Sequence, residues 1–76
     1  MKTTAILNDA DMCLGLRIAG VDTHHVKTED ELSAALDSVS ITDTGLLIIS
    51  EAFANSAEVI DFAKKYPQLL ISEVDM

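Results

Sequence analysis

The feature that most constrains the fold is an alternation of short strand-like runs and helical segments along all 76 residues. The runs are rich in apolar or β-branched residues, and the segments between them show helical spacing of apolar residues. The strand-like runs are residues 3–7, 21–26, 46–50 and 69–74. Because the links are short, consecutive strands must be joined through helices. The alternation therefore predicts an α/β domain with a parallel sheet.

The first helical segment, residues 11–19, contains the stretch GLRIAGV at its end. We expect its buried stripe to consist of Met12, Leu16 and Ala19. Gly20 stands where a helix commonly ends in the left-handed conformation, and Gly15 would let the helix backbone approach the sheet closely. Arg17 is expected on the outward face, where it would contact a partner or pair with a surface acid.

The second and third helices have clear start and stop residues. Thr28 and Glu31 form a capping-box pattern, which begins the second helix. Its expected buried stripe is Leu32, Ala35, Leu36 and Val39. Ser56 caps the third helix, and Pro67 ends it because a proline disfavours helical geometry at the residue before it. Its expected inward residues are Val59, Phe62, Ala63 and Tyr66.

The order of the strands follows from their polarity. Residues 21–26 are the most polar run, which suits a sheet edge, and residues 46–50 are continuously apolar, which suits the centre. With right-handed crossovers, these positions predict the spatial order 2-1-3-4 with helices on both faces. We therefore expect residues 1–76 to form one small doubly wound domain of the receiver or Rossmann type.

The charge of the chain excludes several classes of partner. Thirteen acidic and five basic residues give a net charge of −8, which would repel a phosphate backbone or an anionic membrane. Cys13 is the single cysteine, so no internal disulfide can form. No run approaches the ~20 apolar residues of a membrane span. These features fit a cytoplasmic protein that binds neither nucleic acid nor membrane directly.

The candidate site lies where the strand order reverses, beyond the carboxyl ends of the first and third strands. The residues expected there are Asn8, Asp9 and Asp11 from the first loop and Ser50, Glu51 and Ala52 from the third. The acids suggest a degenerate response-regulator-like signalling module that binds metal at Asp9 and Asp11. Against this hypothesis, Ser50 stands where such a receiver needs its phosphate-accepting aspartate, and both acids are suited to capping the first helix.

No other motif in the sequence indicates catalysis, a cofactor or a metal. His24 and His25 are neighbours on a strand and would point to opposite faces, so they cannot bind one ion together. Cys13 lies within a helix and lacks an evident cation that would activate it. No glycine-rich phosphate loop follows the first strand. We expect no small-molecule substrate and no enzymatic activity.

The order and spacing of four segments add a family resemblance. ILNDADMCLGLRIAGV, VKTEDELSAAL, TGLLIISEAFA and LLISEV together resemble the F subunit of the V-type and archaeal A-type rotary ATPases. Residues 15–21 match the family's G-F-R-L-A-G-I-like helix end in register, with Leu16 in place of the usual aromatic residue. Asn8 replaces a glycine often found in the first turn. The family usually continues into a C-terminal helical segment that is absent here.

This resemblance implies a non-catalytic role in the central stalk. It implies that the chain docks on the coiled-coil D subunit and supports ATP-coupled proton or sodium-ion transport, peripheral to the membrane. The partner surface would then be the candidate site together with Arg17. A stand-alone acidic α/β domain with an unrelated partner is the third hypothesis.

Overall fold

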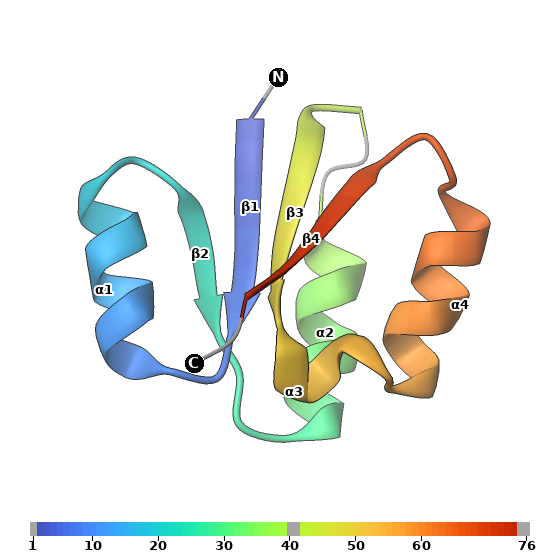
Figure 1. The fold of residues 1–76 in the computed structure, drawn as a ribbon, viewed down its shortest axis with the longest axis horizontal. Helices are drawn as coiled ribbons and strands as arrows, with labels where there is room; N and C mark the ends of the chain where they lie inside the picture. The colour runs from blue at the N-terminus through green and yellow to red at the C-terminus, as the bar shows by residue number, and fades with distance from the viewer. Residues whose placement is uncertain (1, 40–41, 75–76) are drawn as a thin grey trace.

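The computed structural model describes residues 2–39 and 42–74, and these form one four-stranded sheet covered by helices (Figure 1). The strands are β1 (Lys2–Leu7), β2 (Asp22–His25), β3 (Thr44–Ser50) and β4 (Leu70–Val74). The helices are α1 (Ala10–Ile18), α2 (Glu29–Ser38), α3 (Glu51–Ala54) and α4 (Ala57–Lys65). All strand pairs are parallel and the order is β2-β1-β3-β4, which confirms the predicted doubly wound fold.

The larger core lies on the face of the sheet that α2 and α4 cover. Ile6, Leu47 and Ile49 project from the two central strands and are fully buried. They meet Leu32 of α2 and Val59 of α4. The predicted stripe of α2 is confirmed, and the predicted inward residues of α4 are buried or half-buried.

The smaller core lies on the opposite face, under α1 (Figure 1). Ala5 and Leu7 of β1 and Cys13 of α1 are its buried members. The predicted stripe of α1 is wrong in two of its three residues, because Met12 and Ala19 are exposed and only Leu16 packs against this cluster. The helix is rotated so that Cys13, rather than Met12, faces the sheet.

The two glycines of the GLRIAGV stretch have different outcomes. Gly20 has φ +93°, the left-handed conformation predicted for the end of α1. Gly15 is exposed, and a Cβ built on it would have no neighbour within 4 Å. The expectation that Gly15 lets the helix approach the sheet is therefore wrong.

Side-chain caps fix the beginnings of the three longer helices. Asp9 accepts from the backbone N–H groups of Asp11 and Met12, at 2.9 and 3.1 Å. Thr28 accepts from Glu31 N–H at 3.2 Å. The Glu31 carboxylate in turn accepts from Lys27 N–H at 3.1 Å, whereas a capping box would have it accept from the N–H of Thr28, one residue later. Ser56 accepts from Val59 N–H at 3.4 Å, as expected for the start of α4.

Candidate partner-binding surface

The carboxyl ends of β1 and β3 are joined by a reciprocal side-chain contact. The backbone N–H of Asn8 donates to Ser50 Oγ at 2.9 Å, and the Ser50 hydroxyl donates to Asn8 Oδ1 at 3.0 Å. Ser50 is only 1% exposed, whereas Asn8 is exposed. The two predicted site residues are thus brought together, but Ser50 supports the loop from inside and cannot itself meet a partner.

Asp9 and Asp11 both stabilise the beginning of α1. Asp9 is the N-cap, and Asp11 lies in the first helical turn, where a negative charge complements the helix dipole. Among residues 2–39 and 42–74, no group of three or more His, Cys, Asp or Glu side chains is placed to hold a metal ion. The arrangement gives the receiver hypothesis no support, because the Asp9 carboxylate already has two backbone donors and Ser50 occupies the phosphate-acceptor position.

Glu51 and Ala52 belong to α3, a four-residue helix that the sequence pattern does not predict. Both are exposed, so they do reach the surface at the carboxyl end of β3. Ser50 is the N-cap residue of α3 but makes no side-chain capping bond there. Its hydroxyl is instead engaged with Asn8 across the sheet.

Arg17 lies at the far end of α1 from Asp9 and Asp11. Its guanidinium Nη2 donates to the backbone carbonyl of Thr23 on β2 at 3.1 Å. The side chain therefore fastens the end of α1 to the edge strand instead of standing free or pairing with an acid. The residue is exposed, so part of its side chain remains accessible to a partner.

The remaining candidates for chemistry have structural roles. Cys13 is 2% exposed, and its Sγ lies 4.0 Å from the Leu7 carbonyl and 3.9 Å from the His24 carbonyl. Burial raises the pKa of its thiol, although the Arg17 charge opposes this shift. His24 is half-buried on edge strand β2 and lies 3.8 Å from an Asp22 oxygen, while His25 is exposed. The thiol is a packing group rather than a nucleophile.

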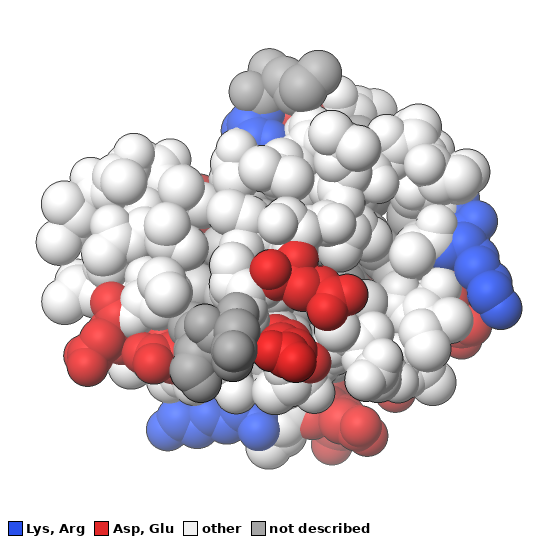
Figure 2. All heavy atoms as spheres, in the orientation of Figure 1, with Lys and Arg blue, Asp and Glu red and all other residues white. Residues whose placement is uncertain are grey.

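Acidic side chains gather at the carboxyl end of the sheet, in the lower half of Figure 2. The surface over α1, at the left of the same view, carries almost no charge above its first turn. Leu14 and Ile18 on this helix are 57% and 79% exposed, and neither is among the site residues expected from the sequence. The signal that could have found them is the composition of α1, which is apolar on every side apart from Asp11 and Arg17.

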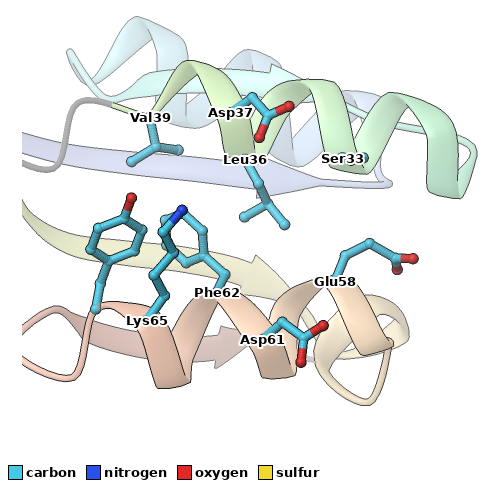
Figure 3. Close-up of a pocket in the computed structure, with 9 residues that line it drawn as sticks. Ser33, Leu36, Asp37, Val39, Glu58, Asp61, Phe62 and Lys65 are labelled. Atoms are coloured by element: carbon cyan, nitrogen blue, oxygen red, sulfur yellow. The ribbon is translucent and has the colours of Figure 1, made fainter.

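A groove of about 280 Å³ separates α2 from α4 (Figure 3). Leu36, Phe62 and Tyr66 supply its apolar lining, and the Phe62 and Tyr66 rings lie 5.0 Å apart. Three acids, Asp37, Glu58 and Asp61, line it together with one base, Lys65, so negative charge predominates around the apolar surface. An anionic ligand is unsuited to this groove.

The fold, with its carboxyl end closed by Asn8 and Ser50, is that of a small doubly wound α/β domain. Within the described residues, no helix has the length and apolar character needed to cross a membrane. Residues 4–74 match the model of the family described as ATP synthase (F/14-kDa) subunit.

Two relatives from Archaeoglobus fulgidus agree with this match. The F subunit of its A-type ATP synthase is 30% identical over 77 residues, covering 99% of this chain and 67% of the relative. The crystal structure of the F subunit of a V-type ATP synthase has a TM-score of 0.63 at 19% identity, covering 93% of this chain and 95% of that one. The chain belongs to the family of ATP synthase F subunits.

This membership confirms two of the expectations from the sequence. The chain is an accessory subunit of a V/A-type rotary ATPase and is not itself catalytic. Its fold is that of the solved V-type F subunit. Its partners are therefore other subunits of the same complex.

Proposed function

We propose that this chain is a central-stalk subunit of the rotor that docks on the coiled-coil D subunit. In that position it supports ATP-coupled transport of protons or sodium ions, on the cytoplasmic side and peripheral to the membrane. The observation that carries this proposal is the family match over residues 4–74, together with a switch point closed by Asn8 and Ser50. A domain of this shape contributes through surface contacts.

The partner surface we propose begins at the carboxyl end of the sheet. Its exposed members are Asn8, Asp11, Arg17, Glu51 and Ala52, with Asp9 half-exposed and Ser50 supporting the loop from beneath. The net charge of −8 favours a partner with basic residues facing this end. Long coiled-coil helices supply such residues on their outer positions.

The test is complex formation between this full chain and the folded coiled coil of the D subunit, measured by co-purification and isothermal titration calorimetry. We expect a saturable 1:1 complex whose affinity falls as salt is raised, because surface charges contribute to it. Asp11→Lys should weaken binding more than Glu29→Lys, a matched charge reversal in the first turn of α2. The absence of a complex when both proteins are folded would contradict the proposal.

A further inference from the structure

The outer face of α1 has the character of a surface that is covered in the assembled protein. Of the five large hydrophobic residues that are exposed in the described part of the chain, three lie on this nine-residue helix. They are Met12, Leu14 and Ile18, at 39%, 57% and 79% exposure. An isolated exposed leucine needs no explanation, but several on one short helix do.

The other long helices have the polar outer faces that surface helices normally carry. The exposed positions of α2 include Glu29, Asp30 and Asp37, and α4 carries Asp61 and two lysines in its last turn. In α1 the only charged residues are Asp11 and Arg17, and Arg17 already donates to the Thr23 carbonyl. On the face seen in Figure 2, the surface over α1 carries almost no charge above the first turn. The remaining charge of the helix is Arg17, which is exposed in its last turn.

The helix is apolar on two opposite sides. Cys13 and Leu16 face the sheet, while Leu14 and Ile18 are four residues apart and so lie one turn above the other on the exposed side. A helix that has apolar residues on its outer side as well as its inner side is characteristic of a position covered by another element. The nine residues span about 14 Å at 1.5 Å each, enough to pack against two turns of another helix.

The charges around this face favour a helix of another protein over a second copy of this chain as the binding partner. A second copy of the chain would bring together two molecules that each carry −8, with Asp9 and Asp11 at the end of each contact surface. A helix with an apolar stripe and a lysine or arginine at one end meets the same face without repulsion. Its cation would lie against Asp11, which is exposed beside the apolar residues.

We propose that the outer face of α1, centred on Leu14 and Ile18, is the docking surface for an amphipathic helix that carries a basic residue at the end that meets Asp11. This inference rests on the proposed function, in which the partner is a coiled coil. It moves the centre of the interface from the carboxyl end of the sheet along α1, so that Asp11 marks one end of the contact and Arg17 the other. The partner's apolar residues would lie outside its own coiled-coil seam.

The test compares three aspartate substitutions in the full chain by titration calorimetry against the coiled-coil partner. Leu14→Asp and Ile18→Asp should each weaken binding at least tenfold. Leu70→Asp is the matched control, because Leu70 is 69% exposed on edge strand β4, and it should change the affinity less than threefold. Circular dichroism checks that each variant is folded. Ile18→Ala, which places a good helix former in α1, should weaken binding by a smaller factor than Ile18→Asp does.

The possible outcomes separate this inference from the proposed function. If the unmodified chain binds and Leu14→Asp and Ile18→Asp bind equally well, the α1 surface is wrong and the stalk role stands. If the unmodified chain does not bind, the stalk role fails and this inference fails with it. If the unmodified chain sediments as a dimer that Ile18→Asp converts to a monomer, the occupant is a second copy and the proposed partner helix is overturned.

Discussion

Ser50→Ala tests how much the contact between the carboxyl ends of β1 and β3 contributes to stability. The substitution removes the oxygen that accepts from Asn8 N–H at 2.9 Å. Because Ser50 is only 1% exposed, the substitution also leaves a space the size of one oxygen atom in the interior. Because this hydrogen bond is part-buried, its loss should cost about 1 kcal/mol. Asn8→Ala should cost under about 1 kcal/mol, because the Asn8 side chain is exposed and Ser50 can still accept from the backbone.

Urea unfolding followed by circular dichroism measures both effects. With a denaturant slope of about 1 kcal/mol/M for a chain of this size, Ser50→Ala should lower the midpoint by roughly 1 M. In the double variant, the loss should be smaller than the sum, since both substitutions remove the same hydroxyl-to-amide hydrogen bond. Equal losses for the two single variants, or a loss below about 0.5 kcal/mol for Ser50→Ala, would refute the reasoning.

Three further predictions concern stability. Gly20→Ala should cost about 1 kcal/mol because the φ of +93° at this position strains any residue with a Cβ. Gly15→Ala should instead stabilise the protein by about 0.5–1 kcal/mol, since Gly15 is helical and a Cβ there meets no neighbour. Calorimetric melting compares the two variants. Thr28→Ala should lower the free energy of unfolding by about 1 kcal/mol through loss of the α2 cap, measured in urea; no change would contradict the capping role. Burial raises the pKa of the Cys13 thiol, so the folded state retains this proton more tightly than the unfolded state. That contribution is complete below the unfolded pKa and is lost as pH rises through the folded pKa. The free energy of unfolding should therefore fall at alkaline pH, and Cys13→Ala should remove this part of the fall.

The fold was predictable because its determinants are local and mutually consistent. The polar second strand and the continuously apolar third strand predicted an edge and a centre, and the structure has β2 and β3 in those positions. Thr28 and Ser56 predicted two helix starts correctly. The four residues of α3 were missed because one helical turn is too short to show a period.

The orientation of α1 could not be predicted for a different reason. Its sequence, ADMCLGLRI, contains apolar residues on every side, so stripes through Met12, Cys13 or Leu14 fit helical spacing equally well. The position of β2 and the carbonyl of Thr23, which anchors Arg17, decide which stripe faces the sheet. Both belong to tertiary structure, and for this reason the exposed face of α1 emerged only from the three-dimensional arrangement.

Asn8 and Ser50 lie at the carboxyl ends of β1 and β3, as predicted, but the roles of these side chains were not all foreseen. The first and third loops do meet, through Asn8 and Ser50, as the switch-point rule requires. Their mutual hydrogen bonds depend on the register of β1 and β3, which pairs Ile6 with Ile49. A sequence does not state that register directly, so the burial of Ser50 could not be anticipated.

The parallel connection of β1 to β3 also governs how this chain assembles during synthesis. Asn8 and Ser50 are 42 residues apart, and no neighbouring strands among those described form a local hairpin. The central strand pair therefore cannot close until β3 has left the ribosome. A nascent chain that ends at α2 lacks Leu47, Ile49 and Leu69, which complete the larger core. Only β1 and β2 can pair before then, so the larger core forms late, once β3 and β4 are present.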